Sequence, residues 1–153
     1  MKLYLAFGSN LGEREKTIRE ALKMCIEQIG ELEVCSSFFE TKPLNPPELE
    51  TQPDYINGAA IFKTDREPNK ILKIIQSIEE KLGRDRANEV HWGPRTIDLD
   101  ILLLGDTVLK SKELTIPHPE MHKRSFVLEP LIEIDPAAMH PIFKKTVLQL
   151  LNS

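Results

Sequence analysis

Two carboxylates separated by one residue, Asp98 and Asp100, are the side chains whose type and spacing point most directly to chemistry. Alternate side chains of a strand share a face and lie about 6.6 to 6.8 Å apart, so both carboxylates face the same way. Carboxylates beside a core carry a desolvation cost unless cations neutralise them. Mg²⁺ is held by one or two carboxylates plus substrate phosphates. The spacing therefore indicates a magnesium and phosphate site; the alternative is a solvated or arginine-paired couple with a structural role.

The strand that carries this pair is expected to be covered on both faces, because the apolar run 101–104 follows it directly. Strict alternation predicts one face made of Thr96, Asp98, Asp100, Leu102 and Leu104. The opposite face is then made of Ile97, Leu99, Ile101 and Leu103. The carboxylates would lie where a polar cleft meets the core.

Three arginines, Arg84, Arg86 and Arg95, lie close to the aspartates in the sequence. A guanidinium offers paired donors at fixed angles, which fit phosphate oxygens. Together with a Mg²⁺-bound polyphosphate, such an array suits phosphoryl transfer. The alternative for Arg84 and Arg86 is a surface role, paired with Asp85 and Glu89.

Other polar side chains are candidates for ligand contact. Leu72, Gln76 and Glu79 share the flank of an amphipathic helix, where the two polar groups either reach a ligand or are simply solvated. His118 and Arg124 are two further possible phosphate donors.

Tyr55 and Asn57 share a strand face and combine an aromatic surface with an amide that suits a flat heterocycle. Core packing of Tyr55 and a turn role for Asn57 are the alternatives.

The elements that must position these residues predict an α+β fold. The expected order is strand 2–7, helix 13–29, strands 32–39 and 55–64, helix 68–82, strand 98–104, a hairpin at 105–106, helix 126–134 and a last helix from about 146. Strand, helix, strand, strand, helix, strand is the ferredoxin-like βαββαβ pattern, here with C-terminal helical additions. No repeat or linker divides the chain, so residues 1–153 are expected to form one domain.

Composition excludes several classes of protein. The net charge of -4 argues against broad nucleic-acid binding, which needs a basic face. No window approaches the roughly 20 apolar residues of a membrane span. The apolar start of the chain is too short for a signal peptide, and two cysteines fit a reducing compartment. A cytoplasmic monomer that does not associate with membranes is expected.

Five segments together resemble the 6-hydroxymethyl-7,8-dihydropterin pyrophosphokinase family. They are Gly8-Ser9-Asn10-Leu11-Gly12, Thr41-Lys42-Pro43, Gln52-Pro53-Asp54-Tyr55-Ile56-Asn57, Gly93-Pro94-Arg95-Thr96-Ile97-Asp98-Leu99-Asp100, and Pro117-His118-Pro119 with Met121, Arg124, Phe126-Val127-Leu128 and Pro130-Leu131. The resemblance spans nearly the whole chain, and the Gly93 to Asp100 run is its most specific part.

The resemblance implies a folate-pathway enzyme of ferredoxin-like fold. It would transfer pyrophosphate from ATP, its co-substrate, to 6-hydroxymethyl-7,8-dihydropterin and release AMP. Asp98 and Asp100 would hold two Mg²⁺ ions between the ATP phosphates and the pterin hydroxyl. Two alternatives remain: a non-catalytic nucleotide- or pterin-binding regulatory domain of the same fold, and a different Mg²⁺-dependent kinase or nucleotidyl transferase.

The resemblance also implies roles for individual residues. The catalytic set would be Arg84, Arg95, Asp98 and Asp100. ATP would contact Leu72, Gln76, Glu79, Arg84, Arg86, Trp92, Arg95, Ile101, Thr115, His118 and Arg124. The pterin would contact Thr41, Pro43, Leu44, Tyr55, Asn57, Trp92, Asp98 and Phe126. Two positions depart from the family pattern: Asn45 replaces a common Gly, and Glu113 replaces a basic residue of some members, whose phosphate contact Lys110 or Lys112 would supply.

Overall fold

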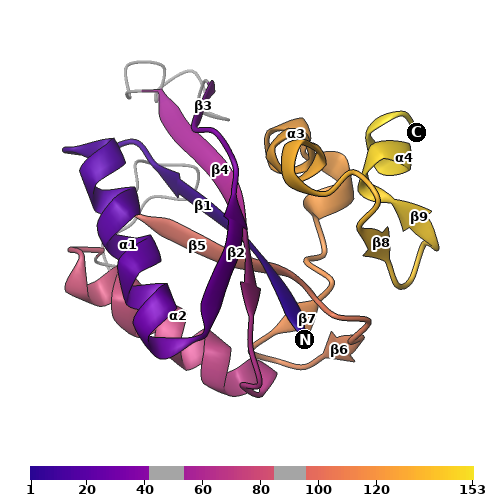
Figure 1. Cartoon of the computed structure of the whole chain (residues 1–153), viewed down its shortest axis with the longest axis horizontal. Coiled ribbons are helices and arrows are strands. Elements are labelled where there is room, and N and C mark those ends of the chain that lie inside the picture. Colours follow the sequence, from indigo (N-terminus) through magenta and orange to yellow (C-terminus); the bar gives the residue numbers. More distant parts are fainter. Residues whose placement is uncertain (42–53, 85–95) are drawn as a thin grey trace.

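A central antiparallel sheet with helices on both faces forms the body of the protein (Figure 1). The computed structural model describes residues 1–41, 54–84 and 96–153. Its elements are β1 (Lys2–Ser9), α1 (Arg14–Gln28), β2 (Glu31–Cys35), β3 (Phe39–Thr41), β4 (Tyr55–Lys63), α2 (Pro68–Lys81), β5 (Asp98–Leu104), β6 (Leu109–Lys110), β7 (Thr115–Ile116), η3 (Met121–Lys123), α3 (Ser125–Ile134), β8 (Met139–His140), β9 (Lys145–Thr146) and α4 (Val147–Leu151).

The strand order of the main sheet is β2-β4-β1-β5, and β3 also pairs with β4. All of these pairings are antiparallel. The first strand of the chain thus lies between β4 and β5, with Gly8 opposite Asn57 on one side and opposite Asp98 on the other. This register brings the polar ends of three strands together at one end of the sheet.

Apolar side chains cover both faces of the sheet. Helices α1 and α2 pack on one face, where Ile18 and Ile71 are fully buried against strand residues such as Leu5. Helices α3 and α4 lie on the other face, where Leu131 and Val147 are fully buried (Figure 1). The sheet is therefore the middle of three layers, and the α+β prediction is confirmed.

The predicted helices are confirmed, and each predicted end lies within one residue of the observed one. Helix α2 begins at Pro68, whose fixed φ suits a first helical position, and it stops just before Gly83, which has a φ of +97°. Helix α4 follows Thr146, which forms a capping box with Gln149.

Two strand predictions were wrong. The single strand expected over residues 32–39 is divided into β2 and β3, because the Ser36 hydroxyl accepts the Ala59 N–H at 2.9 Å in place of a strand carbonyl. The chain turns at Gly105, but no hairpin with β5 follows: β6 pairs with β7 instead. The His118 N–H donates to the Leu102 carbonyl at 3.0 Å, so the segment after β7 lies beside β5.

Strict alternation along β5 holds for both aspartates but fails further on. Tyr4 pairs with Leu103 and the next residue, Leu5, pairs with Ile101, so Leu102 is the extra residue of a β-bulge. Beyond it the faces are exchanged: Leu103 joins the core under α3, and Leu104 joins the core under α1 and α2. This is the reverse of the predicted assignment for these two leucines.

No helix in the described ranges is both long and apolar enough to cross a membrane.

Gly58 is expected to be intolerant of a side chain, because a Cβ there would lie 2.2 Å from Cζ of Phe7 and 2.8 Å from Oγ of Ser36. Phe7 is buried and cannot swing away. Gly58→Ala should therefore lower the free energy of unfolding by about 1–3 kcal/mol in urea titrations. Adding Phe7→Leu should restore part of the loss, since it removes the clashing ring atoms; a purely additive double variant would contradict this explanation.

Candidate active site

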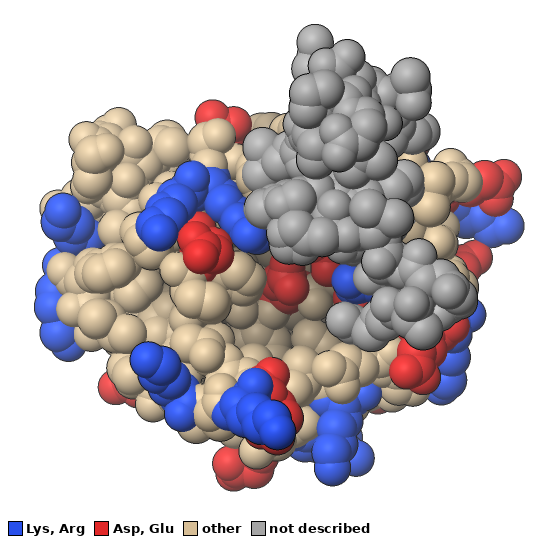
Figure 2. Space-filling view, turned by 180° about the vertical axis from the view of Figure 1, so that it is seen from behind, with Lys and Arg blue, Asp and Glu red and all other residues tan. Residues whose placement is uncertain are grey.

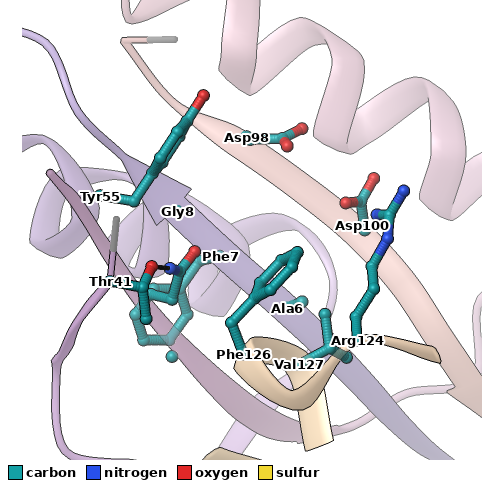
Figure 3. A pocket seen from close by; sticks show the side chains of 12 residues that line it. Ala6, Phe7, Gly8, Thr41, Tyr55, Asp98, Asp100, Arg124, Phe126 and Val127 are labelled. Carbon is teal, nitrogen blue, oxygen red and sulfur yellow. Dashed lines mark hydrogen bonds between the residues drawn. The ribbon is translucent and has the colours of Figure 1, made fainter. Parts of the chain in front are cut away.

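A pocket opens on the α3 face of the sheet, where β1, β4 and β5 end. Its floor is formed by β1, where Ala6 and Gly8 have little or no side chain (Figure 3). The walls comprise Thr41, Tyr55, Asn57, Asp98, Asp100, Arg124, Phe126 and Val127, from β3, β4, β5 and the start of α3. The sequence predicted most of these wall residues, but five residues that line the pocket were missed: Ala6, Phe7, Gly8, Gly58 and Val127. The spacing of the small residues Ala6 and Gly8 on one face of β1 was the available signal.

The pocket has the form of a slot between two aromatic rings. Tyr55 and Phe126 stand on different elements and flank the hollow over Gly8 (Figure 3). A Cβ at Gly8 would lie 2.8 Å from Oδ1 of Asn57, so the glycine leaves space for that amide. The Asn57 Nδ2 group donates to the Thr41 hydroxyl, which fixes the amide plane. The slot therefore offers flat apolar surfaces and an oriented amide.

Asp98 lies at the mouth of the pocket, with 36% of its side chain exposed. Arg84 Nη1 is 3.0 Å from Oδ1 of Asp98 and 2.6 Å from Oε2 of Glu79. The same Glu79 oxygen accepts the Leu99 N–H at 2.8 Å, and Glu79 is fully buried. Glu79 therefore lies beneath Arg84, and its predicted contact with the nucleotide stays a prediction.

Asp100, two residues along β5, has a pKa raised to about 8. Burial is the main cause, and the negative charges of Asp98 and Glu79 add to it; Arg124 and Arg84 act in the opposite direction. The Arg124 guanidinium extends toward Asp100 in Figure 3. Burial and the surrounding negative charge therefore disfavour an ionised Asp100 that has no cation beside it, so the site favours the arrival of positive charge.

A second groove lies between α2 and the chain after β5. It is lined by Leu72, Ile75, Gln76, Leu99, Asp100, Ile101, Ser111, Lys112, Glu113, Leu114, Thr115, His118 and Pro119. Asp100 borders both this groove and the pocket under α3. A ligand in one site and a ligand in the other would meet at this carboxylate.

His118 adds a donor at the edge of the groove. Its Nδ1 accepts the Glu120 N–H at 3.1 Å, which places the proton of the neutral ring on Nε2. Burial, followed by the nearby Arg124 charge, lowers its pKa, so the ring is neutral near pH 7. A neutral N–H donor of this kind can bind a phosphate oxygen.

The carboxylates suit a hard cation that takes only part of its coordination from protein. In the described ranges, no group of three or more His, Cys, Asp or Glu side chains is placed to hold a metal. A pair of carboxylates such as Asp98 and Asp100 fits the Mg²⁺ pattern, in which water and substrate phosphates complete the shell. Figure 2 shows acidic atoms within a hollow, with Lys and Arg side chains around that face.

Comparison with known proteins assigns the family. The sequence model of the 7,8-dihydro-6-hydroxymethylpterin-pyrophosphokinase (HPPK) family matches residues 4–136. The chain belongs to the HPPK family. Two HPPK relatives are named 2-amino-4-hydroxy-6-hydroxymethyldihydropteridine pyrophosphokinase. The Haemophilus influenzae protein is 45% identical over 86% of this chain and 79% of its own length; the Bacillus subtilis protein is 44% identical over 86% and 76%.

Solved HPPK domains have the same fold at much lower identity. The Plasmodium falciparum HPPK-DHPS protein, solved with pteroate, superposes with a TM-score of 0.75 at 18% identity. The match covers 99% of this chain and 42% of that longer one. The α+β architecture is therefore common to HPPK domains.

The structure places the described candidate residues of this HPPK chain in two groups. Thr41, Tyr55, Asn57, Asp98, Asp100, Arg124 and Phe126 line the pocket, whereas Leu72, Gln76, Asp100, Ile101, Thr115 and His118 line the groove. Arg84 and Glu79 form the pair beside Asp98. Pro43, Leu44, Arg86, Trp92 and Arg95 lie outside the described residues, as does Asn45.

The raised pKa of Asp100 predicts a pH dependence of stability. The folded state holds this proton up to about pH 8, whereas the unfolded chain releases it near pH 4. The free energy of unfolding of the metal-free protein should therefore fall as pH rises from 4 to 8, and Asp100→Asn should reduce this slope.

Carboxyl ¹³C NMR provides the direct measurement, and Asp98→Asn is the matched variant. Removing the Asp98 charge should lower the pKa of Asp100, because that charge helps to raise it. An Asp100 that titrates near 4 in the wild-type protein would contradict the prediction.

Proposed function

We propose that this chain transfers a pyrophosphoryl group from ATP to the hydroxyl of 6-hydroxymethyl-7,8-dihydropterin and releases AMP, a step of folate biosynthesis. The observation that carries the proposal is that Asp100 borders both the aromatic pocket and the groove beside α2. Two substrates bound in these sites would meet at the carboxylates. The names of the HPPK relatives support the pyrophosphokinase activity and do not favour the regulatory-domain alternative.

The aromatic pocket is the proposed pterin site. Tyr55 and Phe126 flank a slot that suits a flat ring system, and ring stacking would orient the heterocycle. The Asn57 amide would recognise the amide edge of the ring, since it can both donate and accept hydrogen bonds. Thr41 fixes that amide. The ring orientation would direct the hydroxymethyl group toward Asp98.

The groove beside α2 is the proposed nucleotide site. Leu72, Ile101 and Thr115 would border the adenine, and Gln76 lies on the same wall. Lys112 and Glu113 also line the groove, so Lys112 can offset the acidic residue found where some members have a basic one. Its inner end reaches Asp100 and His118, where the phosphates would lie.

Charge neutralisation is the proposed contribution of the residues between the two sites. Asp98 and Asp100 would hold two Mg²⁺ ions, which supply Lewis-acid polarisation of the phosphates and the hydroxyl when bound. Arg84, Arg124 and His118 would donate to phosphate oxygens as negative charge shifts toward AMP. The substrate hydroxyl oxygen attacks the β-phosphorus. The bond between the β-phosphorus and the oxygen that joins it to the α-phosphorus breaks, so that oxygen leaves with AMP, and the hydroxyl proton is released to solvent. No covalent enzyme intermediate is needed.

Several finer assignments are part of the same proposal. The strand order β2-β4-β1-β5 supports the ferredoxin-like class, with the C-terminal elements as additions to one domain over residues 1–153. Glu79 is proposed to hold Arg84 from below. The roles of Pro43, Leu44, Arg86, Trp92 and Arg95, the monomeric state and the cytoplasmic location stay predictions from the sequence.

The reaction products test the proposal directly. The protein is incubated with ATP, MgCl₂ and 6-hydroxymethyl-7,8-dihydropterin, and nucleotides and pterins are separated by chromatography. Equal amounts of AMP and pyrophosphorylated pterin are expected. Formation of ADP would indicate a single-phosphoryl kinase, and binding without turnover would indicate the regulatory domain; either result would overturn the proposal.

Asp98→Asn and Asp100→Asn should each reduce kcat by at least about a hundredfold, because each removes half of the protein charge that holds the cations. Both variants should remain folded by circular dichroism. Asp106→Asn is the matched control, since Asp106 is an exposed aspartate just beyond the other end of β5. Wild-type turnover by either site variant would contradict the two-metal assignment.

A further inference from the structure

We propose that Arg14 is a positioning residue for the pterin site: from outside the pocket it holds the two strand ends that carry Thr41 and Tyr55. The inference rests on the proposed function for the identity of the ligand. Arg14 lies in the first turn of α1 and does not line the pocket. The residues that line the pocket therefore do not reveal an effect of Arg14 on ligand binding.

The guanidinium of Arg14 contacts both strands that form the polar wall. Nη1 donates to the Asp54 carbonyl at 2.7 Å, and Nη2 donates to Oε1 of Glu40 at 3.3 Å. Glu40 directly precedes Thr41, and Asp54 directly precedes Tyr55. The Arg14 side chain thus contacts the residue that directly precedes each of these two pocket residues.

The strand register carries this restraint into the pocket. Thr41 pairs with Tyr55, Glu40 with Ile56, and Phe39 with Asn57. The Asn57 amide in turn donates to the Thr41 hydroxyl. A shift of β3 along β4 would therefore move Thr41 away from Asn57 and release the amide. Arg14 opposes this shift because it contacts both partners at once.

The strand β3 needs an external restraint because it is short. It has three residues, so few ladder hydrogen bonds fix its position on β4. Helix α1 is packed into the core through Ile18, Leu22 and Cys25, and it provides a rigid base for Arg14. The rigid helix can therefore fix the short strand through one side chain.

The expected effect is on ligand binding more than on global stability. The side chain of Glu40 is 64% exposed, and an exposed ion pair contributes little to the free energy of unfolding. The planar fork of an arginine reaches two acceptors with separate nitrogens, whereas a lysine presents one compact ammonium group. Arg14→Lys should therefore restore only part of the function that Arg14→Gln loses.

The test compares Arg14→Gln with Arg19→Gln in steady-state kinetics and in direct titration of 6-hydroxymethyl-7,8-dihydropterin. Arg19 is an arginine of the same helix, but its guanidinium lies over the Phe38 ring at 5.1 Å and not on the strand ends. Arg14→Gln should raise the Kd and KM for the pterin by about tenfold, with kcat, the KM for ATP and Tm close to wild type. Arg19→Gln should leave the pterin constants unchanged.

Hydrogen exchange gives an independent readout of the restraint. The amides of Thr41, Tyr55 and Asn57 should exchange faster in Arg14→Gln than in wild type or Arg19→Gln. Equal pterin binding by wild type and Arg14→Gln would overturn this inference alone, as would equal losses for both substrates with a lowered Tm. Failure of the wild-type protein to bind the pterin would overturn the proposed function together with this inference.

Discussion

The concentration of negative charge at the start of β5 is the constraint on which the rest of the site depends. Asp98, Asp100 and the buried Glu79 lie close enough to influence one another, and Arg84 lies between the first and the last of them. Leaving one of these charges buried without a partner would cost several kcal/mol, so the arginine and the carboxylates stabilise a common geometry. The charges of this group are not fully balanced, because burial and the charges of Asp98 and Glu79 raise the pKa of Asp100. A cation bound beside Asp100 would complete the charge balance of this group, which is why the proposed function places Mg²⁺ and phosphates here.

The sheet topology places this charged centre between two chemically different surfaces. Strand β1 pairs with β4 on one side and with β5 on the other, so the aromatic and amide groups of β4 face the carboxylates of β5 across a strand whose side chains there are small. Because β5 is the last strand in the order, it also borders the groove beside α2. An edge strand can thus serve two ligands with alternate residues, which a strand covered by neighbours on both sides cannot do as readily.

Much of this arrangement was predictable from sequence, for identifiable reasons. The helices follow from apolar periodicity with Pro68 and Gly83 at the ends of α2, and the shared face of Asp98 and Asp100 follows from strand geometry. The grouping of the site residues came from the family resemblance. Individual hydrogen bonds of side chains were not predictable. The Ser36 hydroxyl interrupts a strand, and the fully buried Glu79 binds both Arg84 and the Leu99 amide. Such contacts join residues that are distant in the sequence, so local sequence patterns do not predict them.

The bulge at Leu102 divides β5 into two segments, and the alternation of side chains between the two faces of the sheet starts anew after it. On the site side, pairing with Ala6 and Gly8 sets the direction of the aspartates; beyond the bulge, pairing with Leu3 and Tyr4 sets the direction of the leucines. Loss of one residue at this point would restore a regular ladder and keep every remaining side chain on its present face. A shorter β5 that lacks Leu102 would therefore keep both carboxylates on their present face, and its cost would fall on the far side of the strand, where the Leu102 carbonyl accepts the His118 N–H.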